Sequence, residues 1–96
     1  MDKMMKLAVA RDHNASAEAL NHLSYDPERW IRKLVAENLN TTPSTLDRLS
    51  GDKWFRVRKA VAKNYNTPDH SLHKLLNDSN AEVSKAAMKN LNRRNK

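Results

Sequence analysis

The segment that decides the fold is IRKLVAEN, at residues 31–38. It returns 26 residues later as VRKAVAKN at 57–64, and after a further 26 residues as VSKAAMKN at 83–90. Counting back by the same distance gives the related string MKLAVARD at 5–12. Recurrence at a fixed spacing is the signature of a repeat architecture, in which each unit is one supersecondary element. The sequence therefore predicts a 26-residue unit written three times in full, with a partial copy in front.

A second block follows each copy at a constant distance. Leucine pairs recur at Leu20/Leu23, Leu46/Leu49 and Leu72/Leu75. In the first block, Ile31, Leu34 and Val35 lie on one stripe of a helix with 3.6 residues per turn. The leucine pairs indicate a second, shorter helix. The predicted helices alternate between long and short, at residues 2–12, 16–24, 27–39, 43–50, 53–65, 68–77 and 80–93.

Stacking is the consequence of this pattern, because neither helix of a pair can bury its apolar stripe alone. We therefore expect an all-α fold, a short α-solenoid of about three and a half 26-residue two-helix repeats. One domain should span residues 1–96. Its predicted parts are a partial repeat at about 1–14, repeats at 15–40, 41–66 and 67–92, and a basic tail at 93–96 that frays.

Polar residues at the predicted helix starts are typical of N-caps. The expected caps are Asp26, Asp52 and Asp78 for long helices, Thr42-Pro43 and Thr67-Pro68 for short ones, and a capping box formed by Ser79 and Glu82. The three aspartates should lie one repeat apart, roughly 10 Å. That distance is too long for shared acid–base chemistry, so N-capping is the favoured interpretation.

Asparagine recurs in two columns, at Asn14, Asn40, Asn66 and Asn92, and at Asn38, Asn64 and Asn90. Two interpretations compete. The amides could contact a bound peptide or bases, or they could form a ladder that satisfies backbone groups in the turns between helices, with left-handed geometry at the helix C-caps. A column that is kept in every repeat favours the ladder.

Several chemistries lack the residues they need. The absence of cysteine excludes disulfides, thiolate nucleophiles and sulfur-bound metals. His70 and His73 share a helix face, but no third ligand stands beside them in a metal spacing. No nucleophile–base–acid triad or glycine-rich phosphate loop is present. We therefore expect no catalytic residues, no metal, no cofactor and no enzymatic activity.

Charge and hydropathy suggest the cellular location of the protein and the charge of its partner. No run approaches the roughly 18 apolar residues of a membrane span, and residues 1–11 do not resemble a signal peptide, so a cytoplasmic location is expected. The formal net charge is +7, and all of the excess lies in residues 52–96, because 1–25 and 26–51 are each balanced. Such asymmetry favours an anionic partner surface, although it also serves solubility.

Positions where the repeat is broken give the candidate binding site. On a helical wheel, Trp30 and Phe55 point away from the core stripe, whereas Trp54 is expected in the core. Basic residues surround them, and the candidate binding residues are Arg29, Trp30, Arg32, Lys33, Phe55, Arg56, Arg58 and Lys59. Tryptophan and arginine are enriched in protein-binding hot spots, and aromatic–basic surfaces also suit single-stranded nucleic acid. The alternative is that the aromatics cover a seam between repeats and the arginines are a solvated face.

The pattern as a whole resembles a known family. Val-Arg-x-x-Val-Ala-x-Asn, then Asn-Thr-Pro, then Leu-x-x-Leu-x-x-Asp is similar to the leucine-rich repeat variant, a relative of HEAT-like repeats. The residues that carry it are 31–38, Asn66-Thr67-Pro68, Leu72, Leu75 and Asp78. The resemblance implies a right-handed superhelix of alternating longer and shorter helices used for binding. This repeat is slightly longer than usual, and the cysteine-bound iron–sulfur cluster of some members cannot form here.

Together these observations predict a non-enzymatic protein–protein interaction module. At this size, a small stoichiometric regulator or adaptor that binds a larger protein is the leading interpretation. The alternative is a nucleic-acid-binding protein that uses the basic face of the C-terminal half. Self-association through exposed apolar residues at one end, Met1, Met4, Met5 and Leu7, is compatible with either.

Overall fold

The computed structural model describes residues 1–95, and these contain seven helices and no strand. The helices are α1 (Lys3–Arg11), α2 (Ala17–Leu23), α3 (Arg29–Glu37), α4 (Pro43–Leu49), α5 (Phe55–Lys63), α6 (Asp69–Leu75) and α7 (Ala81–Arg94). Each of the seven predicted helices is present, so the all-helical prediction is confirmed.

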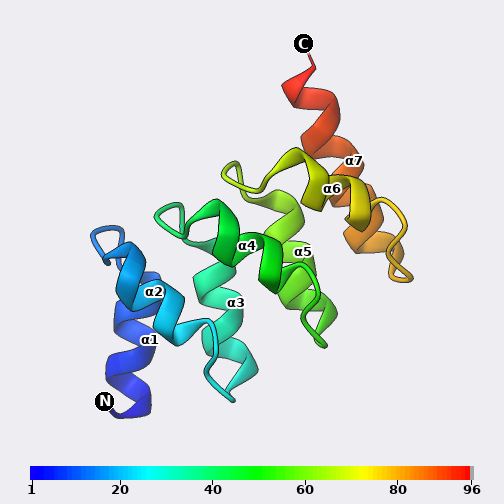
Figure 1. Cartoon of the computed structure of the whole chain (residues 1–96). Coiled ribbons are helices and arrows are strands. Elements are labelled where there is room, and N and C mark those ends of the chain that lie inside the picture. Colours follow the sequence, from blue (N-terminus) through cyan, green and yellow to red (C-terminus); the bar gives the residue numbers. More distant parts are fainter. Residues whose placement is uncertain (96) are drawn as a thin grey trace.

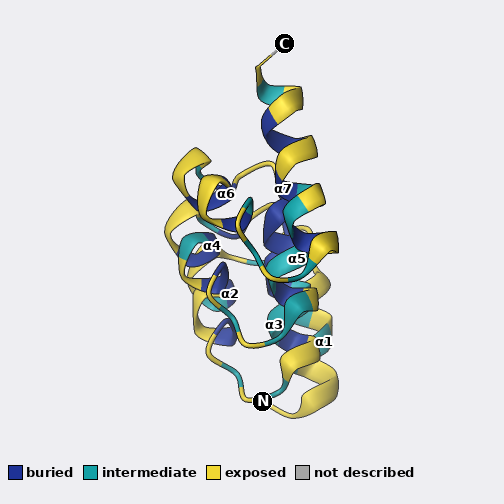
Figure 2. Ribbon diagram, turned by 90° about the vertical axis from the view of Figure 1, so that its right-hand side faces the viewer, coloured by how far each residue is buried: buried dark blue, intermediate teal, exposed yellow. Residues whose placement is uncertain are grey.

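The helices lie in two layers (Figure 1). The longer helices α1, α3, α5 and α7 form one row, in which each contacts the next, and the shorter helices α2, α4 and α6 form the other. The view turned by 90° shows the short helices on one side, the long helices on the other and buried residues between them (Figure 2). The molecule is elongated, with extents of 39 × 25 × 16 Å.

The core fills the space between the two layers. Its fully buried residues come from equivalent positions, with Leu20, Leu46 and Leu72 from the short helices and Ile31, Val57 and Val83 from the long ones. Ala10, Ala36 and Ala62 are also buried and let consecutive long helices approach closely. Met88 occupies the same column on α7 and is 52% exposed, because no further helix of the described chain covers that side.

The long helices begin differently from the prediction. Asp26, Asp52 and Asp78 are not N-caps; the N-caps of α3, α5 and α7 are Glu28, Trp54 and Asn80. Each aspartate instead accepts a hydrogen bond from the backbone N–H two residues later, at 2.9–3.0 Å. This turn, closed by the aspartate side chain, fixes the chain just before the helix. Asn80 also replaces Ser79 as the capping residue, so the predicted capping box is wrong.

The short helices confirm one predicted cap and correct another. Thr42 caps α4 by accepting from the backbone N–H of Thr45 at 3.3 Å, and Pro43 is the first helical residue. Thr67 does not cap α6, because its hydroxyl donates to the carbonyl of Val61 at 2.6 Å. Pro68 takes the N-cap position without any side-chain bond.

One of the two asparagine columns forms the predicted ladder. We call its members, Asn38, Asn64 and Asn90, the asparagine ladder. Asn64 Nδ2 donates to the carbonyls of Ala36 and Asn38, at 2.9 and 3.1 Å, in the preceding repeat. Asn38 and Asn90 make the equivalent pairs of bonds. The ladder therefore satisfies buried carbonyls at the ends of the long helices. The left-handed geometry expected with it is absent, because no residue from 1 to 95 has positive φ.

The last helix extends into the segment that was predicted to be a basic tail. α3 and α5 end at residues 37 and 63, whereas α7 continues to Arg94, because the Thr-containing turn is replaced there by Arg93-Arg94. Arg94 Nη1 donates to the carbonyl of Thr67 at 2.6 Å and to Asp69 Oδ1 at 2.7 Å, and its Nη2 donates to the carbonyl of Tyr65 at 2.9 Å. Residues 93 and 94 of the predicted tail are therefore helical, Asn95 is the C-cap of α7, and residue 96 lies outside the described residues.

Candidate interaction surface

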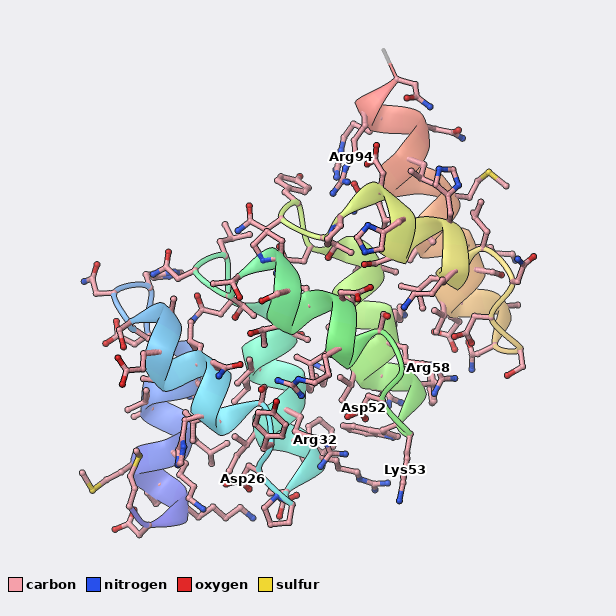
Figure 3. All side chains as sticks on the ribbon, in the orientation of Figure 1. Asp26, Arg32, Asp52, Lys53, Arg58 and Arg94 are labelled. Carbon is pink, nitrogen blue, oxygen red and sulfur yellow. The ribbon has the colours of Figure 1, made fainter. Side chains whose placement is uncertain are left out.

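Two of the predicted binding arginines lie in a row of ion pairs between repeats. Arg32 Nε lies 2.7 Å from Asp52, and Arg58 Nε lies 2.7 Å from Asp78. Figure 3 shows Arg32 with Asp52, and Arg58, near the starts of α3 and α5. Lys6 pairs with Asp26 at 2.8 Å in the same way. We call these three contacts the ion-pair row.

Each arginine of the row also braces its own turn. Arg58 Nη1 donates to the carbonyls of Asp52 and Lys53, at 2.9 and 3.1 Å, and Arg32 makes the equivalent bonds to residues 26 and 27. The hydrogen bond from Arg58 lowers the pKa of the Asp78 carboxyl, and the same bond raises the pKa of Arg58. The side chains of Arg32 and Arg58 are each only 17% exposed, so both are engaged within the fold.

The remaining aromatic and basic candidates gather at the starts of α3 and α5. The rings of Trp30 and Trp54 meet edge to face, with centroids 4.8 Å apart and planes at 75°. The Arg29 guanidinium lies 4.5 Å from the Trp54 centroid, and Lys33 Nζ lies 5.9 Å from that of Trp30. Both distances fit cation–π contacts. Trp30 is 46% exposed, so its indole is held in place and open to solvent.

The predicted binding residues on α5 differ from one another in burial and in their partners. Phe55 is half-buried against the core, so the expectation that it points away from the core is wrong. Arg56 is exposed and lies 5.3 Å from the Phe55 ring centroid. Lys59 pairs with Glu82 at 2.8 Å. Its hydrogen bond, with smaller effects of Arg56 and Lys63, lowers the pKa of the Glu82 carboxyl.

The structure therefore brings together Arg29, Trp30 and Lys33, and adds Trp54, which the sequence placed in the core. We call these four residues the tryptophan cluster. Trp54 packs against the core as expected, but it also carries Arg29 on its ring and supports Trp30. Its position in the turn before α5 explains why a helical wheel did not show this second role.

The other predicted features have simpler surroundings. On the short-helix side, His70 Nε2 lies 3.4 Å and Lys74 Nζ 3.2 Å from Asp47 Oδ1. The hydrogen bond from Ser71 lowers the pKa of Asp47. No group of three metal-ligating side chains occurs within residues 1–95. No described helix has the length and apolar character needed to cross a bilayer.

The N-terminal methionines are exposed as expected, with Met4 at 77%. Met1 and Met5 are also exposed, whereas Leu7 packs against the core. Self-association through this end stays a prediction.

Comparison with known proteins gives no relative from which a function could be taken. No protein-family model, no curated protein sequence and no solved structure matches this chain.

Proposed function

We propose that the seven helices form a short right-handed α-solenoid of 26-residue repeats, of the leucine-rich repeat variant or HEAT-like type. We further propose that it acts in the cytoplasm as a non-enzymatic protein-interaction module, a small regulator or adaptor that binds a larger protein in a fixed ratio. The tryptophan cluster is the proposed contact surface, and Arg56 flanks it on α5. Arg32 and Arg58 are left out of this surface, because their guanidinium groups bind Asp52 and Asp78.

The observation that carries this proposal is the state of Trp30. A large indole that is 46% exposed leaves apolar area for a partner to cover. Because Trp54 supports it from one side at 4.8 Å, the ring is already held before a partner arrives. A contact residue that is held in advance loses little conformational entropy on binding. Tryptophan flanked by arginine is also the composition of protein-binding hot spots.

Trp30→Ala tests the proposal, with Tyr25→Ala as the matched control. Like Trp30, Tyr25 is an exposed aromatic with a cation near its ring, with Arg48 3.7 Å from the ring centroid, and it lies just after α2. Partner capture from lysate should fall at least about tenfold for Trp30→Ala and stay unchanged for Tyr25→Ala. Circular dichroism should show the same helix content in both. Equal capture by all three proteins would rule out the tryptophan cluster as the contact surface.

Nucleic-acid binding is the second candidate, favoured by the excess of positive charge in residues 52–96. Here capture should disappear after nuclease treatment, and the affinity should fall steeply as salt rises. Captured protein that survives nuclease supports the interaction module instead.

A further inference from the structure

Three hollows lie between consecutive long helices, at equivalent places. The first, between α1 and α3, includes Arg11, Leu34 and Glu37. The second, between α3 and α5, includes Glu37, Ala60 and Lys63. The third, between α5 and α7, is lined by Lys63, Tyr65, Ala86, Lys89, Asn90 and Arg93. We call this third hollow, of about 260 Å³, the α5/α7 groove.

The three hollows differ in charge. In the first two, the carboxylate of Glu37 shares the lining with a cation, Arg11 or Lys63. The α5/α7 groove is lined by three cations, Lys63, Lys89 and Arg93, and by no acidic residue. None of these three forms an ion pair with a described carboxylate. Within residues 1–95, no carboxylate therefore lies within ion-pair distance of the three cations of this groove.

Arg93 is held in position by the feature that sets α7 apart. At residue 64 the asparagine Oδ1 accepts from the backbone N–H of Asn66, after α5 has ended. α7 continues past the equivalent point, and Asn90 Oδ1 instead accepts from Arg93 Nη2 at 3.0 Å. Arg93 Nη1 donates to the Tyr65 hydroxyl at 3.0 Å, and the guanidinium stacks 4.0 Å from the Tyr65 ring centroid. The Arg93 guanidinium is thus held in one orientation, while each of its Nη atoms retains one further N–H that can donate.

We propose that the α5/α7 groove binds an acidic peptide segment of the partner protein, with its carboxylates between Lys63 and Lys89 and against the fixed Arg93. This inference rests on the proposed protein-interaction function and names the chemistry of the partner at a second contact. A planar guanidinium held in one orientation suits a carboxylate, since the two groups match in geometry.

The shape of the charged region favours a peptide over nucleic acid. Nucleic-acid affinity comes from neutralising many phosphates along a continuous track. Here the cations do not form such a track along the row of long helices, because the next hollow carries Glu37. On the other side, Lys89 and Arg93 share one further hollow with Lys85. One face of the Tyr65 ring, which could stack on a base, is already covered by Arg93. A short acidic segment needs only the local charge that the groove supplies.

The repeats provide matched variants for the test. Lys89→Glu gives the α5/α7 groove the cation-and-carboxylate lining of the first hollow. Glu37→Lys makes the reverse change in the first two hollows. The probe is a fluorescein-labelled peptide of alternating glutamate and serine, compared with its glutamine counterpart and with a single-stranded oligonucleotide of equal charge. Fluorescence anisotropy at low salt measures the affinity, and amide shifts in NMR spectra locate the bound peptide.

The acidic peptide should bind to the wild-type chain and shift the amides of Lys63, Tyr65 and Lys89. Lys89→Glu should weaken binding roughly tenfold, Glu37→Lys should strengthen it, and the glutamine peptide should not bind. Absent binding, shifts outside the groove, or tighter binding of the oligonucleotide at the groove would each overturn the proposal. The titration needs no natural partner, so its failure leaves the Trp30→Ala result standing, and a negative Trp30→Ala result leaves the titration interpretable.

Discussion

The asparagine ladder and the ion-pair row join the same long helices at opposite ends, with opposite chemistry. At the C-terminal ends, Asn64 is 3% exposed and binds two carbonyls of the preceding repeat without any charge. At the N-terminal ends, Arg58 and Asp78 are charged, and the side chain of Arg58 is 17% exposed. A buried neutral bond depends on geometry alone, whereas a charged pair near water also depends on pH and salt. The stability of one molecule is thus divided between a part that is insensitive to pH and salt and a part that depends on them.

Asn64→Asp should have the largest effect on stability. The substitution keeps the side-chain oxygen that accepts from Asn66, but it replaces the donor with a carboxylate facing the carbonyls of Ala36 and Asn38. We expect a loss of about 3 kcal/mol in the free energy of unfolding, measured by urea titration.

The control for this prediction is Asn92→Asp. Asn92 is exposed on α7, so its change should stay within about 0.5 kcal/mol. A loss below about 1 kcal/mol for Asn64→Asp would mean that the ladder contributes little, and the contrast with the ion-pair row would fail.

Arg58→Met should have an intermediate effect, of about 2 kcal/mol at low salt. It removes the partner of Asp78 and the two bonds to the carbonyls of Asp52 and Lys53. Adding Asp78→Asn to this variant should cost less than the same change costs in the wild type, because the two residues are coupled. Strictly additive losses, measured as a double-mutant cycle, would show that the pair acts as two separate residues.

Acid should produce the smallest and most selective change. The pKa of Asp78 lies below its ordinary value of 3.8, chiefly because of the hydrogen bond from Arg58. Its stabilising contribution is therefore fully present above pH 3.8 and is lost as the pH falls through the lowered pKa. The urea midpoint of the wild type should fall in this acid range, and that of Arg58→Met should fall less. Equal acid sensitivity of the two proteins would assign the effect to other carboxylates.

The sequence predicted the seven helices because the apolar periodicity and the 26-residue spacing are local patterns. It did not predict the role of Asp52, because an aspartate before a helix has two common roles. It can be the N-cap itself, or it can lie two residues before the N-cap and close a turn with its side chain. The second arrangement is the one observed, and in it the carboxylate also binds Arg32 from the preceding repeat. No helical wheel shows a partner 20 residues away, which is why Arg32 was counted among the binding residues.

Only part of the candidate surface was predicted, because a helical wheel places only residues within a helix. The wheel indicated that Trp30 is exposed, since that residue lies within the helix α3. It could not place Trp54 beside Trp30, because Trp54 belongs to a turn whose path depends on packing. The signal for the longer α7 was present, as the Thr-Pro turn is missing at residues 93–94, but the basic residues there were interpreted as a tail that frays.

The bonds made by Arg94 have a consequence for the order in which the protein opens. Both end helices take part in the asparagine ladder, through Asn38 and Asn90. Arg94 additionally fastens the last helix to the carbonyls of Tyr65 and Thr67 and to Asp69, whereas the additional ion pairs of α1 are made by lysines. In a row of helices that contact mainly their neighbours, opening starts at the end with the weaker attachment. Amide hydrogens of α1 should therefore exchange with deuterium before those of α7, so that the molecule has a fast end and a slow end.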